Sequence, residues 1–441
     1  MGPENNEARL ESELTGIRAT PANLPPPTRR IMGKPSIKQT FSSLSQPSYR
    51  ILWISMVFQM GAMQIQMMTQ GFYVFDLTGS ATILGIVTAS AAIPTLPLVL
   101  FGGTLADRLD KKRIIQAGQL VSLAAGLFIA ISITTDTITW YHFLAMSMVQ
   151  GIIMSLVMPA RQALIPQVVG QDRLMNAMAL NALGMSVTTM AAPAIAGGLI
   201  AAIGADGAYY VMAGMNAASV FFIGFLPKLI QSESRLKTSI LSEMGQGFRY
   251  MRSNSAIRIL FFMGIIQLML MMPIRFIMPI FAKDVFEVGP EGLGLMFSAM
   301  GFGSLAGALF IASVGHMSSR GLVLALTGIL SGALLLGFSF MSAFLPVYFF
   351  ALCILALSGT IQSGRQTLQQ SMVMEYTDPE YRGRVMGFNM LGFGIMPAAV
   401  LPLTMGSDFF GAPAALGIMA AVFMGVGALI VAFSPTIRKL H

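Results

Sequence analysis

Residues 103–113 read GTLADRLDKKR; they end one apolar run, 81–104, and lead into another, 114–135. Each run reaches the roughly 20 residues that a helix needs to cross the hydrocarbon core of a membrane. A short charged loop between two such runs predicts a pair of membrane-spanning helices whose basic residues stay at one membrane surface.

The composition of the whole chain agrees with a membrane protein. Of its 441 residues, 55% are apolar and 10% are charged, whereas soluble domains have about 45–50% apolar and about 25% charged residues. These values exclude an ordinary soluble protein and also a fully disordered chain, which combines low hydrophobicity with high net charge. The long unbroken apolar runs argue against an outer-membrane barrel, whose strands alternate polar and apolar residues.

The residue types that build metal and redox centres are scarce. The chain has one cysteine, Cys353, and three histidines, His142, His316 and His441, which form no cluster. We therefore expect no disulfide, no metal site and no bound cofactor. The net charge of +8 is explained by basic residues retained on the cytoplasmic side of a membrane, so we expect no nucleic-acid partner.

Apolar runs divide the chain into two similar parts. Twelve membrane-spanning helices are predicted at about 50–75, 81–104, 114–135, 138–160, 174–203, 207–230, 256–283, 290–314, 321–342, 345–366, 384–406 and 411–434. They make two six-helix bundles, an N-terminal half at 48–230 and a C-terminal half at 254–434. The remaining segments are a disordered, proline-containing tail at 1–47, a charged linker at 231–253 and a short C-terminus at 435–441.

Charged residues sort to two sides of this topology. With twelve crossings, one side receives Arg50, the Lys111–Arg113 cluster, Arg173, the linker and Arg382. The other side is acidic, with Lys283 as its only basic residue; it carries Asp76, Asp136, Asp206, Asp284, Glu287, Glu291 and Asp408. Because basic loops remain in the cytoplasm, the tail, the linker and the C-terminus are all predicted to be cytoplasmic.

The two halves share an internal repeat. Arg161-Gln162 recurs as Arg365-Gln366, and Gln59, which follows an Arg-Ile-Leu triplet, recurs as Gln267 after the same triplet. Arginines are rare near membrane spans, so the paired arginines carry the most weight. With six spans in each half, corresponding helices have the same orientation, as in transporters whose halves rock about a site near the membrane midplane.

The loop at 103–113 resembles the Gly-x-x-x-Asp-Arg-x-Gly-Arg-Lys signature of the major facilitator superfamily, with Asp110 where the family has glycine. Three further stretches look like the branch that includes enterobactin-exporter-like and macrolide-efflux-like proteins: Leu77–Ala81, Pro159–Pro166 and Arg382–Met386. This resemblance implies a multi-pass transporter of the cell (inner) membrane, a monomer and not an enzyme. It implies export of small drug-like or siderophore-like molecules, usually in exchange for protons.

Other functions stay open beside this one. The same fold can import a small organic solute, or serve as a membrane scaffold that transports nothing. A membrane-embedded enzyme would need a nucleophile with a base, or a metal cluster, and the serines, Cys353 and the histidines show neither pattern.

The resemblance implies a gate at the cytoplasmic side. Asp107 can accept hydrogen bonds at the start of the eleventh span near Arg382, since anions are favoured at helix N-termini. Arg108 and Arg161 can pair with acids that are exposed in only one conformation, which biases a two-state equilibrium. The alternative is that these bases only fix the topology. The full predicted gating set is Gly103, Asp107, Arg108, Lys112, Arg113, Arg161 and Arg365.

The same resemblance places the first, fourth, seventh and tenth helices around a central cavity. Polar side chains on these helices face protein or water more often than lipid, although helix–helix hydrogen bonding explains them equally well. The predicted cavity residues are Gln59, Gln66, Gln150, Gln267, Arg275 and Gln362.

Arg275 is the most informative single charge, because it lies inside the seventh span. It can bind an anionic group of the substrate, pair with Asp76 or Asp284 as an outer gate, or extend to the membrane surface. No Asp or Glu lies at the centre of any span, so the sequence shows no buried carboxylate to carry a coupling proton.

Overall fold

The computed structural model describes residues 42–98, 110–170, 173–227, 240–313, 319–382, 384–385, 392, 394–434 and 437. These residues form helices and no strands, and the chain from Ser42 onward makes one compact unit. Nine of the described helices are long and apolar enough to cross a membrane. The predicted all-α membrane class is therefore confirmed. The predicted tail lies outside the described residues up to residue 41.

The N-terminal half begins with a short 3-10 turn. Its elements are η1 (Ser42–Ser45), α3 (Pro47–Thr78), α4 (Ala81–Ser90, helical on to Leu98), α6 (Lys111–Thr134), α7 (Trp140–Val169) and α8 (Leu174–Gly224). Helix α8 contains two predicted spans, which break at Gly204. The backbone there has φ 79°, a conformation that glycine adopts without strain.

Side-chain caps explain where two of these helices begin. The Ser80 hydroxyl accepts the backbone N–H of Ile83 at 3.3 Å and starts α4. Asp110 accepts the backbone N–H of Lys112 at 3.0 Å and starts α6. Asp is among the preferred N-cap residues because its carboxylate satisfies an amide that has no partner within the helix. The departure from the family signature at Asp110 thus has a local structural reason.

The predicted linker contains one described helix, α9 (Ile240–Ser253). The elements of the C-terminal half that follow it are α10 (Ser255–Leu270), α11 (Ile274–Ile280), the π-helix η3 (Phe281–Val285), α12 (Gly289–Ser313), α13 (Arg320–Phe344), α14 (Tyr348–Tyr376), η4 (Met396–Ala399), α16 (Val400–Phe410) and α17 (Ala412–Phe433). The described helices of both halves accommodate the twelve predicted crossings.

The seventh span, predicted at 256–283, lies at Ser255–Val285 in the structure, and its helix is interrupted. A turn at 271–273 separates α10 from α11. Pro273 has no backbone N–H, and its ring disfavours helical geometry in the preceding residue. Discontinuous membrane helices are typical of transporter binding sites near the midplane.

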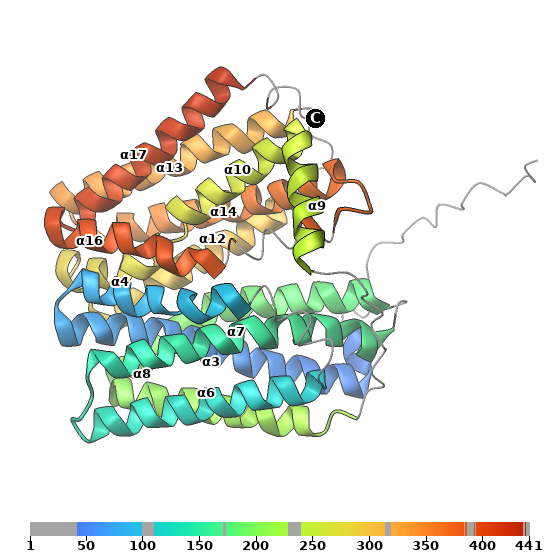
Figure 1. The fold of residues 1–441 in the computed structure, drawn as a ribbon. Helices are drawn as coiled ribbons and strands as arrows, with labels where there is room; N and C mark the ends of the chain where they lie inside the picture. Colours follow the sequence, from blue (N-terminus) through green and yellow to red (C-terminus); the bar gives the residue numbers. More distant parts are fainter. Residues whose placement is uncertain are drawn as a thin grey trace, which may run out of the picture. The chain divides into compact units, whose positions relative to one another are not determined.

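Helices pack within each half and between the halves. Figure 1 shows α6 along α8 in the N-terminal half and α13 along α17 in the C-terminal half. Between the halves, α8 packs against α12, α4 against α16 and α3 against α11. At Gly197 of α8 a Cβ atom would lie 2.5 Å from the carbonyl oxygen of Pro290, so the absence of a side chain permits the close approach of α8 to α12.

Candidate functional site

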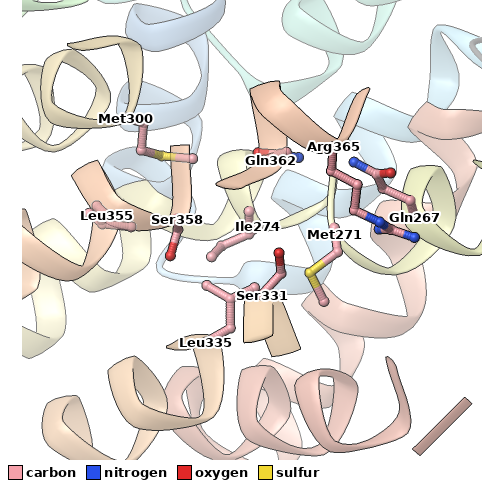
Figure 2. A pocket seen from close by; sticks show the side chains of 10 residues that line it. All are labelled: Gln267, Met271, Ile274, Met300, Ser331, Leu335, Leu355, Ser358, Gln362 and Arg365. Carbon is pink, nitrogen blue, oxygen red and sulfur yellow. The ribbon is translucent and has the colours of Figure 1, made fainter. Parts of the chain in front are cut away.

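A pocket opens beside the break in the seventh span. It is narrow in this conformation: the centres of water-sized molecules can occupy about 20 Å³ of it, within a space of about 380 Å³ that includes open solvent. Four segments line it: α10 to α11, α12, α13 and α14. The lining residues are Gln267, Met271, Ile274, Met300, Ser331, Leu335, Leu355, Ser358, Gln362 and Arg365 (Figure 2). The pocket thus combines one charged group and a few amide and hydroxyl groups with an apolar wall, the composition expected of a small-molecule site.

Arg365 is the only charged residue of this pocket. Its side chain is buried, its Nε donates a hydrogen bond to the carbonyl oxygen of Leu324 at 3.2 Å, and its guanidinium lies 5.3 Å from the ring centre of Phe423. Figure 2 shows Arg365 and Gln267 at the same end of the pocket. Arg365 was predicted as a gating residue; in this structure it lines the pocket.

The repeat counterpart of Arg365 makes a different contact. Arg161 of α7 is buried and donates a hydrogen bond to Oε1 of Gln59 on α3. Gln119 of α6 donates to the same oxygen at 3.5 Å. Within the described residues, Nη1 of Arg161 and Oε1 of Gln119 have no partner. The N-terminal half therefore holds a buried polar cluster of three side chains with hydrogen-bonding capacity left over.

The other predicted cavity residues take separate positions. Gln362 of α14 lines the pocket with Gln267. Gln150 of α7 accepts a hydrogen bond from the hydroxyl of Ser122 on α6 at 3.4 Å. Gln66 of α3 is buried. The structure thus brings Gln267, Gln362 and Arg365 together, and Gln59 joins Arg161 in the other half.

Arg275 lies on α11 and is half-buried. Its Nε is buried and has no hydrogen-bond partner among the described residues. Asp76, one of its predicted partners, instead accepts from Lys283 at 2.5 Å. Of the three roles predicted for Arg275, pairing with Asp76 is not the one that this structure adopts.

Only part of the predicted gating loop can be described. Gly103, Asp107 and Arg108 lie outside the described residues. Lys112 donates from Nζ to the carbonyl oxygen of Gly224 at 2.8 Å, at the end of α8, where a cation is favoured. Arg113 is exposed and pairs with Asp110 at 3.6 Å.

Two contacts join the halves at one end of the bundle. We call this end, which carries Asp76, Lys283 and Asp408, the acidic end. The first is the ion pair of Lys283 with Asp76. In the second, the Asp408 carboxylate accepts from the backbone N–H groups of Ala81 and Thr82 at 2.8 Å each and from the Ser80 hydroxyl at 2.9 Å. Asp408 therefore binds the N-terminus of α4 from the opposite half.

These hydrogen bonds also set the pKa of Asp408, which follows the eleventh predicted span. Partial burial raises the pKa of this carboxyl, but the hydrogen bonds from Thr82, Ala81 and Ser80 outweigh burial and lower it overall. From the sequence, Asp408 is predicted only to lie on the acidic side of the membrane. The available signal was an acid at the end of one span and a Ser-Ala-Thr helix start at 80–82, but only the fold brings them together.

The described residues hold no group of three or more His, Cys, Asp or Glu side chains that could bind a metal ion. His142 instead caps a helix, because its Nδ1 accepts the backbone N–H of Thr139 at 3.0 Å at the start of α7.

Comparisons with known proteins agree with this architecture. The family model described as Major Facilitator Superfamily matches residues 52–400. Macrolide efflux protein A of Streptococcus pyogenes is 26% identical over 351 residues, which cover 77% of this chain and 84% of that protein. The enterobactin exporter EntS of Shigella boydii serotype 4 is 25% identical over 332 residues, 74% of each protein. The branch predicted from the sequence is thereby confirmed.

Solved structures share the fold at lower identity. The nucleoside transporter NupG has a TM-score of 0.67 and 17% identity, covering 87% of this chain and 98% of that chain. A bacterial homologue of the human lysosomal transporter Spinster has a TM-score of 0.63 and 13% identity, covering 92% and 98%. At these identities the similarity concerns the fold alone.

Proposed function

Because the chain belongs to the Major Facilitator Superfamily, we propose that it is a secondary active transporter that exports small amphipathic molecules by alternating access, in exchange for protons. The observation that carries this proposal is the pocket at the break of the seventh span. It offers Arg365 and two glutamines on one part of its lining and methionine and leucine side chains on the rest. The names of the efflux relatives support the outward direction and the drug-like or siderophore-like substrate class.

Alternating access requires that the halves part at one end while they close at the other. The contacts of Asp408 with α4 and of Lys283 with Asp76 support a closed acidic end, which we assign to the outside of the cell. We assign gating of the cytoplasmic end to Gly103, Asp107, Arg108, Lys112, Arg113 and Arg161. We further propose a monomer in the cell membrane with both termini in the cytoplasm.

Everted membrane vesicles test this function. The vesicles would be given an acidic lumen and supplied with a macrolide, enterobactin or a lipophilic dye. An exporter coupled to protons should accumulate at least one of these compounds in the lumen and make the lumen more alkaline as it does so. An uncoupler should abolish both signals, and vesicles without the protein should show neither.

The direction of transport separates the alternatives. Accumulation in right-side-out vesicles but not in everted vesicles would show an importer. Transport that persists without a pH gradient would contradict proton exchange. Failure of a broad panel to move in either orientation would contradict the transporter assignment and favour a membrane scaffold.

A further inference from the structure

Three arginines lie inside the membrane helices and form no ion pair with an acid of the residues that the structure describes. They are Arg161, Arg275 and Arg365, on α7, α11 and α14. The ion pairs among the described residues involve other groups: Arg113 with Asp110, Lys283 with Asp76, and Arg320 with Glu375. Intramembrane arginines are costly and usually mark a functional site. A cation that no acid of the described chain neutralises is suited to a negatively charged ligand.

Arg365 is the one of the three that lines the pocket. Its only hydrogen bond among the described residues uses Nε, which donates to the carbonyl oxygen of Leu324. The terminal Nη groups are therefore the donors left for an occupant. A guanidinium binds oxyanions with two parallel hydrogen bonds, so Arg365 offers the geometry that a carboxylate, sulfonate or phosphate group requires.

Arg365 differs from Arg161, its counterpart in the internal repeat, in the partner of its guanidinium. In the N-terminal half, Arg161 uses the side chain of Gln59 as its acceptor. In the C-terminal half, the equivalent Gln267 lines the same pocket as Arg365, and no hydrogen bond joins the two among the described contacts. The two side chains of the first pair bind each other, whereas those of the second pair do not and stay available to a ligand in the pocket.

The rest of the lining defines the shape of that ligand. Met300 and Leu355 lie at the other end of the pocket in Figure 2, away from Arg365 and Gln267. Methionine adapts to irregular apolar surfaces. The pocket therefore presents a cationic, amide-lined end and an apolar end to a single occupant.

We propose that this pocket selects amphipathic organic anions, whose oxyanion group binds Arg365 with Gln267 and Gln362 while the apolar body contacts Met300, Leu335 and Leu355. This inference rests on the proposed function, because it names the substrate class of the same site. It assigns Arg365 to ligand binding, where the sequence had suggested a gate.

A fluorescent pair of ligands tests the charge requirement directly. Dansylglycine carries a carboxylate, and dansylglycinamide has the same body without the charge. Titration of the purified protein in detergent should give a Kd for dansylglycine at least about tenfold lower, since a hydrogen bond to a charged group contributes enough for such a factor. Equal Kd values for the two ligands would overturn the proposal.

Substitutions then locate the binding site. Arg365→Gln should raise the Kd of dansylglycine about tenfold and leave that of dansylglycinamide within about twofold. Arg365→Lys should retain part of the preference for the anion. The control is Arg320→Gln, which removes a positive charge from the same half at the ion pair with Glu375 and should change neither Kd. An unchanged preference in Arg365→Gln would overturn the proposal.

A second variant covers the case in which Arg365→Gln does not fold. Ser331→Leu narrows the pocket and keeps the arginine, so it should weaken dansylglycine binding; unaltered binding would place the anion elsewhere and overturn the proposal.

Binding that depends on Arg365 supports the anion site even if vesicles transport nothing. Transport of neutral solutes without such binding contradicts the anion site and leaves the proposed export intact.

Discussion

Arg161 of α7 donates a hydrogen bond to Gln59 of α3, whereas their repeat counterparts, Arg365 and Gln267, line an open pocket. An arginine and a glutamine thus join two helices by a hydrogen bond in the N-terminal half, whereas in the C-terminal half the same residue types remain available to bind a ligand. The two halves also differ in the helix that carries the glutamine: a turn at 271–273 interrupts the seventh span four residues after Gln267, whereas α3 is continuous.

The contact of Arg161 with Gln59 predicts a coupled effect on stability. Gln59→Leu should lower the free energy of unfolding by about 1.5–3 kcal/mol, because the buried guanidinium loses its acceptor. Adding Arg161→Met should restore at least about 1 kcal/mol, since the unpaired charge is then removed. Thermal unfolding of the purified single and double variants measures both effects.

A neutral pair of the same kind provides the control for this cycle. Gln150 accepts a hydrogen bond from Ser122, and Gln150→Leu should cost only about 0.5–1.5 kcal/mol because neither group is charged. Strict additivity of Gln59→Leu and Arg161→Met would contradict the coupling.

Adjacent glycines on α8 give a matched test of the contact between the halves. A Cβ at Gly197 would lie 2.5 Å from the carbonyl oxygen of Pro290, whereas nothing lies within 4 Å of a Cβ at Gly198. Gly197→Ala should therefore destabilise the protein by about 1–3 kcal/mol through overpacking against α12. Gly198→Ala should be neutral or stabilise by up to about 1 kcal/mol, because alanine favours a helix. Equal melting temperatures for the two variants would contradict the close approach.

Most of the fold could be predicted because a helix that crosses a membrane needs a long apolar run, which is visible in the sequence. Long apolar runs mark helices, and the arginine pairs of the repeat mark the two halves. The break at Pro273 was missed because the surrounding residues are as apolar as a continuous span, and prolines also occur within helices of this protein, as at Pro159 and Pro166 of α7. A proline alone does not reveal where a membrane helix stops.

The sequence could predict which types of residue line the candidate site, but not which of them lie together. Polar residues on the seventh and tenth spans led to the prediction of Gln267 and Gln362 as cavity residues, and both line the pocket of this structure. Sequence spacing cannot tell whether an arginine meets an amide, as Arg161 does, or a pocket, as Arg365 does, because that depends on packing between helices. The contact of Asp408 with the start of α4 joins residues far apart in the chain, which the spacing of residues within a span cannot reveal.

The Nε of Arg275 is buried and has no hydrogen-bond partner in the described part of the chain, which predicts that this side chain does not stabilise the fold. Arg275→Met keeps the length of the side chain and removes the charge. Its melting temperature should equal or exceed that of the wild-type protein, because burial of an unpaired charge is unfavourable. A melting temperature lower by several degrees would show that Arg275 has a stabilising partner. Arg161→Met, which loses a contact with Gln59, serves as the comparison.

The binding of Asp408 to the N-terminus of α4 predicts a pH-dependent contribution to stability. The pKa of Asp408 is lower in the folded protein than its ordinary value. The contribution is therefore fully present above the ordinary aspartate pKa of about 3.9 and is lost as the pH falls through the lowered pKa of the folded state. At pH 7, Asp408→Asn should cost about 0.5–2 kcal/mol, as for loss of a helix cap.

Thermal unfolding of wild type and Asp408→Asn between pH 7 and pH 3 measures this contribution as a difference, which cancels the titration of other carboxyls. The difference should stay constant down to about pH 4 and shrink below it. Asp284→Asn is the control at pH 7, because the Asp284 carboxylate of η3 accepts no hydrogen bond among the described contacts, and it should leave the melting temperature unchanged there. A difference for Asp408→Asn that is absent at pH 7, or that grows as the pH falls, would show that Asp408 does not hold α4 and α16 together.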